Sequence, residues 1–287
     1  MSLRLISILF LALVSVSSTS LVIRHLAVVP ALTMAFWRLF FAGGMLWGYS
    51  LFSIREKLSM ENRKRTVLAG VLLGCHFACF FIGVKNTSIA NSTLLATLGP
   101  VFTAIIVYGQ GNPIQKHVFL GLFFALAGAG IINFSSGDSG INSLFGNGIS
   151  LLSALFLALT WIVAKKIRED TGVVIYGRSL FLVAAGTILI FSFLAGDSIF
   201  DFQLQHLLWF LFLGFVPSIL GHNLFNYALK YIPPTSVASV PLGEPVLASI
   251  FGIIIFGENV PVGALVGGPF VFFGLYLILK TKNITLI

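Results

Sequence analysis

The sequence predicts an all-α, polytopic membrane protein with ten transmembrane helices that form two five-helix inverted repeats. Three observations support this fold class: a very apolar composition, long apolar runs, and landmarks that recur in the two halves of the chain. Of the 287 residues, 57% are hydrophobic and only 9% are charged, whereas soluble domains contain about 25% charged residues. Because so few charges cannot cover the surface of a soluble protein this long, the chain is expected to span a membrane.

The long apolar runs have the character of helices rather than of strands. A helix needs about 20 apolar residues to cross about 30 Å of hydrocarbon, while a barrel strand alternates apolar and polar residues over about 10 positions. Residues 118–132 and 238–256 do not alternate. Glycine and phenylalanine are equally abundant, with 29 residues each, which suits close helix–helix contacts and a bulky lipid-facing surface. A helical bundle is therefore predicted.

Charged or turn-rich breaks divide the chain into ten apolar segments. The predicted spans are residues 5–23, 31–53, 66–84, 88–108, 117–134, 148–165, 174–195, 207–229, 236–256 and 260–280. The first segment also resembles a signal peptide, because Arg4 precedes an apolar run and a group of small residues. A retained helix is favoured, since the sequence of residues 10–13, Phe-Leu-Ala-Leu, recurs at residues 156–159.

The basic residues predict the orientation of the chain. With the amino terminus in the cytoplasm, 13 of the 17 Lys and Arg residues fall in cytoplasmic segments and only 2 in outer loops. Arg38 and Arg178 lie inside predicted spans. This bias predicts that both termini are cytoplasmic and that the protein lies in an inner membrane. Because the net charge of +8 is spread over several loops, it is a topology signal, and the lipid bilayer rather than nucleic acid is the expected partner.

Landmarks recur in the two halves of the chain, at residues 1–140 and 141–287. Those separated by 145 or 146 residues include Pro100 with Pro245, Gly121 with Gly267 and Gly128 with Gly274. Since each half has five predicted spans, an odd number, the second half must enter from the opposite face of the membrane. Such inverted repeats are characteristic of secondary transporters with a site near the membrane midplane. The two halves can exchange roles, which gives outward-open and inward-open states of similar energy.

Three motifs carry a resemblance to a known family. They are residues 36–42 (Phe-Trp-Arg-Leu-Phe-Phe-Ala), residues 94–103 around Pro100, and residues 241–250 around Glu244-Pro245. With the Gly257-Glu258 pair before the last span, their order and spacing resemble the drug/metabolite transporter superfamily, specifically its ten-helix EamA-type exporters. The resemblance covers essentially the whole chain. It implies export of an amino acid or a related small polar metabolite.

Polar residues inside the spans are the candidates for function, because each is costly to bury in lipid. The predicted substrate-binding residues are His76, Phe80, Thr97, Trp161, His222, Asn223, Asn226, Tyr227 and Glu244. Arg38, Pro100 and Pro245 are predicted to have structural or charge-pairing roles. The third, fourth, eighth and ninth spans are expected to wall a central cavity, with the two prolines facing each other across a pseudo-twofold axis.

Several of these residues have alternative interpretations. Arg38 either neutralises a substrate carboxylate or has a structural role, and the structural role is favoured because the resemblance places an Arg there regardless of substrate. Glu244 either binds an amine or titrates with proton movement, or it is a static partner of Arg38 or a hydrogen-bonded neutral acid; these alternatives stay open. His222 and Asn226 are four residues apart and are expected to share a helix face. Glu258 is expected to be a helix-start acid near the outer surface.

A run of hydroxyl residues in the first span either lines a cavity or packs between helices, and packing is favoured. These residues are Ser15, Ser17, Ser18, Thr19 and Ser20. Cys75 and Cys79 are interpreted as core residues, because a metal site would need further ligands nearby.

The chain offers no motif for catalysis, and no catalytic residue, cofactor or metal is expected. It has no Walker-type glycine loop and no HExxH or nucleophile-elbow pattern. The runner-up function is uptake of a nucleotide-like metabolite. The rivals of another class are an intramembrane lipid-modifying enzyme and a channel. The sequence also allows a homodimer.

Overall fold

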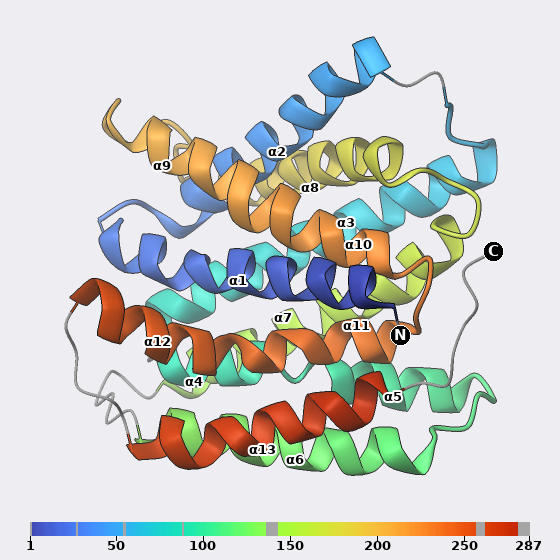
Figure 1. The fold of residues 1–287 in the computed structure, drawn as a ribbon. Coiled ribbons are helices and arrows are strands. Elements are labelled where there is room, and N and C mark those ends of the chain that lie inside the picture. Colours follow the sequence, from blue (N-terminus) through green and yellow to red (C-terminus); the bar gives the residue numbers. More distant parts are fainter. Residues whose placement is uncertain are drawn as a thin grey trace.

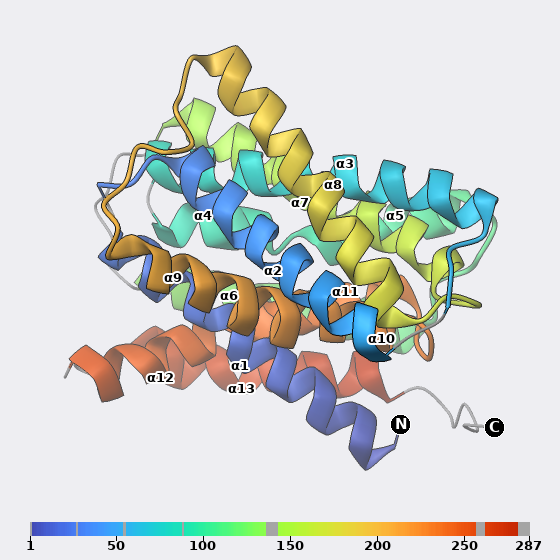
Figure 2. The same cartoon turned by 90° about the horizontal axis from the view of Figure 1, so that it is seen from above.

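The computed structural model describes residues 2–26, 28–53, 56–87, 89–135, 143–256 and 262–280. Within these ranges the secondary structure is helical throughout, with turns and no strands. The predicted all-α class is therefore confirmed for the described part of the chain. The helices lie roughly along one direction and form a bundle in both views (Figures 1 and 2).

The described residues form fifteen helical elements. In order they are α1 (Leu3–His25), α2 (Ala31–Ser53), α3 (Met60–Asn86), α4 (Ile89–Ala96), α5 (Gly99–Gly109), α6 (Lys116–Ser135), α7 (Leu144–Ile167), α8 (Val173–Ala195), α9 (His206–Leu213), η1 (Gly214–Asn223), α10 (Leu224–Ala228), α11 (Pro234–Ser239), η2 (Val240–Gly243), α12 (Glu244–Phe256) and α13 (Val262–Leu279).

Seven helices in the described residues are long and apolar enough to cross a membrane. They are Met60–Asn86, Asn91–Gly109, Lys116–Phe134, Leu144–Ile167, Val173–Ala195, His206–Ala228 and Val262–Leu279. α1 and α2 are also long, with 23 residues each. The structure therefore confirms several helices that suit a membrane, seven among the described residues, but it does not confirm the predicted count of ten.

α3 begins earlier than the predicted span at residues 66–84. Ser59 caps it, with the Asn62 amide donating to Ser59 Oγ at 3.2 Å, and a side-chain cap satisfies an amide that the first helical turn leaves unpaired. Glu61 and Arg65 form an ion pair one turn apart in the added segment. The apolar pattern identified only the lipid-compatible part of α3, whereas the Ser59 cap determines where the helix begins.

Two predicted spans are interrupted where the sequence places proline. The span at 88–108 is divided into α4 and α5 by a turn at Thr97-Leu98, and Pro100 lies in the first turn of α5. The span at 236–256 becomes α11, the short 3₁₀ turn η2 with Pro241, and α12 with Pro245 in its first turn. Proline lacks an amide proton and interrupts the hydrogen-bond ladder, which explains both breaks.

The predicted span at 207–229 is not a uniform α-helix. Between α9 and α10 the chain adopts the ten-residue π-helix η1, which contains Pro217. The Ser218 hydroxyl donates to the carbonyl of Leu213, five residues earlier, at 2.8 Å. A π-helix has an i→i+5 register and is rare outside functional sites. Hydropathy cannot reveal it, because the composition of the segment is that of any apolar helix.

α6 and α13 pack side by side along one edge of the bundle (Figure 1). Their glycines meet directly: a Cβ atom on Gly128 would lie 2.5 Å from the Gly267 carbonyl, and one on Gly121 would lie 2.7 Å from the Gly274 carbonyl. Only residues without a side chain allow two backbones to approach so closely.

Basic residues gather at one end of the bundle. The start of α1, the end of α2, the turn between α5 and α6, the α7–α8 turn, the end of α10 and the end of α13 all lie on the right in Figure 1. These segments carry Arg4, Lys57, Lys116, Lys165, Lys166, Arg168, Lys230 and Lys280. The helix arrangement therefore brings the predicted cytoplasmic segments to a common end.

Candidate functional site

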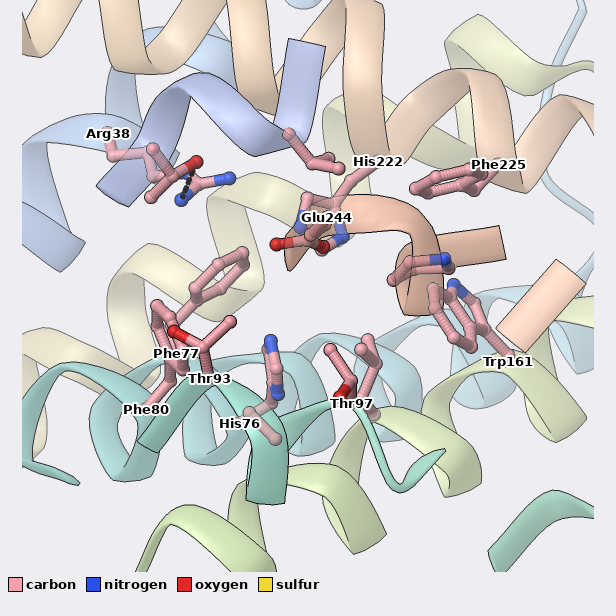
Figure 3. Close-up of a pocket in the computed structure, with 15 residues that line it drawn as sticks. Arg38, His76, Phe77, Phe80, Thr93, Thr97, Trp161, His222, Phe225 and Glu244 are labelled. Carbon is pink, nitrogen blue, oxygen red and sulfur yellow. Dashed lines mark hydrogen bonds between the residues drawn. The ribbon is translucent and has the colours of Figure 1, made fainter. Parts of the chain in front are cut away.

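A small cavity lies inside the bundle, at the level of the two helix breaks (Figure 3). Its volume is about 60 Å³, which is room for about five water molecules. The lining residues are Val16, Thr19, Arg38, His76, Phe77, Phe80, Thr93, Ala96, Thr97, Leu157, Trp161, His222, Phe225, Pro241 and Glu244. They come from α1, α2, α3, α4, the turn between α4 and α5, α7, η1, α10, η2 and α12. Both halves of the chain thus contribute to one polar cavity.

Arg38 is the cation of the cavity and is only 1% exposed. Its Nε donates to Ser218 Oγ at 2.8 Å, and its Nη1 lies 3.5 Å from Thr19 Oγ1. The guanidinium also lies over the Phe77 ring, 4.5 Å from the centroid, a distance suited to a cation–π contact. Nη2 has no hydrogen-bond partner among the described residues. The guanidinium is thus held firmly but is not fully satisfied.

Glu244 supplies the negative charge at the start of α12. Its carboxyl group points into the same space as Arg38 (Figure 3). Within the described ranges, no hydrogen bond or ion pair is formed by this carboxyl group, so Arg38 and Glu244 are not in direct contact. Two groups of opposite charge therefore share one cavity with no hydrogen bond or ion pair between them among the described contacts. The static Arg38–Glu244 pair, one of the alternatives for Glu244, is not present in this structure.

Two histidines meet across the cavity, with ring centroids 6.2 Å apart. His76 Nδ1 lies 3.0 Å from the carbonyl oxygen of Ser153 and 2.9 Å from Ser153 Oγ. The roles in these contacts depend on the tautomer: a protonated Nδ1 donates to the carbonyl, whereas an unprotonated Nδ1 accepts from the Ser153 hydroxyl. The His222 ring contacts Phe77, at 5.1 Å between centroids. One ring is thus fixed by hydrogen bonds and the other by packing.

Aromatic rings and hydroxyl groups complete the wall. The Phe80 ring stacks on His76 with an interplanar angle of 15°, and Trp161 meets Phe225 edge to face. Thr97 lies at the first helix break, where its hydroxyl donates to the carbonyl of Leu94 at 2.8 Å. The cavity therefore combines opposite charges with an aromatic surface, a combination that suits a small molecule with charged and apolar parts.

The structure brings together seven of the twelve residues singled out from the sequence. Those that line the cavity are Arg38, His76, Phe80, Thr97, Trp161, His222 and Glu244. The other five lie elsewhere, and they are Asn223, Asn226, Tyr227, Pro100 and Pro245. Pro100 and Pro245 are buried in the packing of α5 and α12 and do not face each other across the cavity; Pro241 lines it at the second break.

Asn226, which was expected to share a helix face with His222, does not line the cavity beside it. Phe225 takes that place, while the backbone carbonyl of Asn226 accepts from Arg168 Nε at 3.0 Å near the basic end of the bundle. The Asn223 side chain lies against Gly177 of α8, and Tyr227 is near Tyr231, with 3.3 Å between their hydroxyl oxygens. These positions depend on the π-helical register of η1 and on the location of α10 between the cavity and the basic end of the bundle. Neither can be deduced from i, i+4 spacing.

Some lining residues were not singled out from the sequence. Thr93, Phe77 and Phe225 carry no signal, because threonine and phenylalanine are common in any membrane helix. Thr19 belongs to the hydroxyl run, so that run contributes one lining residue, while Ser15 bonds back to the Leu11 carbonyl in its own helix. Cys75 and Cys79 are half-buried free thiols rather than core residues. Glu258, expected at the start of the last span, lies outside the described residues.

A helical bundle with a polar cavity between broken helices defines a membrane protein that handles a small solute. Residues 3–134 and 144–280 each match the EamA-like transporter family. The chain belongs to this family, and it is a membrane transporter.

Relatives agree with this family. The chain is 23% identical to a protein of Archaeoglobus fulgidus named as an uncharacterized transporter, over 70% of each chain. It is 23% identical to the transporter YyaM of Bacillus subtilis, over 84% of this chain and 82% of YyaM. It is 25% identical to the inner membrane transporter YedA of Escherichia coli, over 80% of this chain and 75% of YedA. A solved crystal structure superposes with a TM-score of 0.79 over 96% of both chains at 13% identity, and it therefore shares the fold.

Proposed function

We propose that this protein is a secondary transporter that exports an amino acid or a related small polar metabolite across the inner membrane by alternating access. The observation that carries the proposal is the cavity in which Arg38 and Glu244 lie without direct contact. A zwitterion can satisfy both charges at once, whereas a neutral or singly charged solute leaves one of them buried and unpaired, which is costly. The proposed direction of transport, export, rests on the resemblance to EamA-type exporters. The proposed location in the inner membrane rests on the name of the Escherichia coli relative.

The size of the cavity favours a small metabolite over the nucleotide-like alternative. Its volume is about 60 Å³, whereas pockets for larger organic ligands measure about 300–1,000 Å³. A nucleotide would need a large rearrangement of helices to enter this space. A small amino acid needs only the local opening that an alternating-access cycle provides.

Several features support ten spans in two inverted five-helix repeats. The family matches two successive segments, residues 3–134 and 144–280. Gly121 contacts Gly274, and Gly128 contacts Gly267 in the same way. Gly267 lies 146 positions after Gly121, and Gly274 lies 146 positions after Gly128, so the two contacts are equivalent in the two halves. His76 and His222, also 146 apart, meet in the cavity. A twofold relation between the halves accounts for each of these pairs.

The orientation is part of the proposal. The segments rich in Lys and Arg share one end of the bundle (Figure 1), and basic loops face the cytoplasm in membrane proteins. We therefore assign this end, with the amino terminus and the end of α13, to the cytoplasm.

Counterflow in liposomes tests the proposal against its rivals. Vesicles containing the purified protein and loaded with one unlabelled L-amino acid should accumulate the labelled form, and the rate should saturate. A channel would give flux that does not saturate, and a lipid-modifying enzyme would alter lipid without any gradient. Counterflow with nucleotides but with no amino acid would refute the proposed substrate class.

A further inference from the structure

The surroundings of Arg38 suggest that one end of a substrate has a dedicated place. Three contacts fix the guanidinium: Nε to Ser218 Oγ at 2.8 Å, Nη1 near Thr19 Oγ1 at 3.5 Å, and the plane over Phe77 at 4.5 Å. Long side chains lose considerable conformational freedom when they are held in this way. The contacts therefore pre-order a cation that would otherwise sample many rotamers.

The orientation of the guanidinium leaves donors unused. Nη2 is fully buried and has no hydrogen-bond partner in the described part of the chain, and the Nη1 contact is at the outer limit of hydrogen bonding. A buried unpaired donor on a charged group is expensive. The two terminal nitrogens of a guanidinium form a fork that matches the two oxygens of a carboxylate. A carboxylate arriving in the cavity would satisfy this fork.

The direction in which the fork points depends on Ser218 in the π-helix η1. The Ser218 hydroxyl proton is directed to the Leu213 carbonyl at 2.8 Å, so its oxygen is the acceptor for Arg38 Nε. In an α-helix a serine hydroxyl bonds to the carbonyl three or four residues earlier, whereas here the π register makes the fifth carbonyl the acceptor.

The same π-helix also lies close to α2 at Arg38. A Cβ atom on Gly214 would lie 2.9 Å from Phe41 Cβ and 3.1 Å from the Arg38 carbonyl oxygen. A side chain at this position would push the two helices apart, so glycine allows the contact that brings Ser218 to Arg38. The π register and Gly214 together therefore place Ser218 next to Arg38.

We propose that Ser218 is a positioning residue that aims Arg38 at the carboxylate of the substrate, so that the substrate binds with its carboxylate at Arg38 and its ammonium group toward Glu244. The inference rests on the proposed function and deepens it by assigning each end of the substrate. Glu244 points into the same cavity and has no partner of its own among the described residues (Figure 3). The ammonium group of the substrate is the cation that this carboxylate lacks.

Paired probes test the assignment on the full-length purified protein. The probes are the proteinogenic L-amino acids and their α-amides, which keep the ammonium group but lose the carboxylate; their binding is measured by titration calorimetry. The variant is Ser218→Ala. Its matched control is Ser239→Ala, because Ser239 is equally buried and its hydroxyl also donates to a backbone carbonyl, that of Thr235 at 2.7 Å, away from Arg38.

The expected result is that the wild-type protein binds an acid at least about tenfold more tightly than its amide. Ser218→Ala should reduce this preference about tenfold by weakening acid binding alone, while Ser239→Ala keeps it. Ser218→Thr, which retains the hydroxyl, should restore the preference. A purely structural role of Ser218 would lower thermal stability and leave the acid-to-amide ratio unchanged, which would overturn the inference.

The remaining outcomes separate this inference from the proposed function. If acid and amide bind equally well to the wild-type protein, the carboxylate site at Arg38 is refuted while transport of an amino compound stands. If no amino acid binds and none shows counterflow, the proposed substrate class fails, and the inference fails with it.

Discussion

The two helix breaks border the same cavity but present different chemistry. At the first, between α4 and α5, the polar side chain is Thr97, whose hydroxyl is already engaged by the Leu94 carbonyl at 2.8 Å. At the second, between α11 and α12, the 3₁₀ turn η2 leads into Glu244, whose carboxyl group has no partner among the described residues. Both breaks interrupt a helix in the middle of the bundle, yet only the second brings a charge.

This difference indicates that both breaks shape the cavity, whereas only the second contributes to substrate selectivity. Irregular backbone is tolerated at membrane depth only where protein buries it or where it lines a wet cavity, so both breaks can create space. A neutral hydroxyl that is satisfied within its own helix adds little to recognition, whereas an unpaired carboxylate strongly prefers a cation. We therefore expect substitutions at the second break to alter transport far more than those at the first.

The largest effect is expected for Glu244→Gln, which keeps the shape of the side chain and removes its charge. Loss of a charged hydrogen bond should weaken the apparent affinity for an amino acid by about 1.5–3 kcal/mol, or about 10- to 150-fold. Counterflow at varied substrate concentration measures it. The melting temperature should change little, since no bond of this carboxyl group stabilises the described fold. Unchanged transport by the variant would remove the distinction between the breaks.

An effect of similar size, but on stability, is expected for the contact between α6 and α13, the helices that pack against both helix breaks. Gly128→Ala would place a Cβ 2.5 Å from the Gly267 carbonyl, and such overpacking costs about 1–3 kcal/mol. Gly130→Ala is the control on the same helix, because no atom lies within 4 Å of a Cβ there. Thermal unfolding in detergent should show a lower melting temperature for the first variant only. Equal melting temperatures for the two variants would contradict the close contact.

A smaller contrast is expected between the two histidines. His76→Ala would leave the Ser153 hydroxyl without its partner, which should cost about 1–2 kcal/mol of stability. His222 has no hydrogen bond in the described ranges and contacts Phe77 and Phe225 by its ring, so His222→Phe should preserve the packing. Thermal unfolding should show a larger drop in melting temperature for His76→Ala than for His222→Phe. Equal destabilisation would show that His222 is also anchored.

The smallest effect is expected for Thr97→Val at the first break. This substitution keeps the shape and removes one neutral hydrogen bond to the Leu94 carbonyl; that bond contributes about 0.5–1.5 kcal/mol to the stability of the fold and none to substrate binding. The apparent affinity in counterflow should fall less than about tenfold, and less than in Glu244→Gln. A loss as large as that of Glu244→Gln would place Thr97 in direct contact with the substrate and make the two breaks equivalent.

Composition and hydropathy were enough to establish the class of the protein and the approximate position of its apolar helices. Composition excludes a soluble fold, and hydropathy located α7 and α8 to within a few residues, as residues 148–165 and 174–195 against Leu144–Ile167 and Val173–Ala195. Both interrupted segments were expected to be single spans, and the missing amide of proline, a local property, explains why the helices break near Pro100 and Pro245. Arg38, His76 and Glu244 were recognisable because polar groups in apolar spans are costly and few.

Which of these groups meet depends on contacts between residues far apart in the sequence, and these follow from the packed bundle. The hydrogen bond from Arg38 to Ser218 joins residues 180 positions apart, and that from His76 to Ser153 joins residues 77 apart. The π register of η1 and the depth of α10 placed His222 and Phe225 in the cavity and Asn226 outside it. In a chain that is apolar on every side, hydrophobic pattern does not fix the rotation of a helix about its axis. Packing of the whole bundle fixes it, and with it the identity of the residues that face one another.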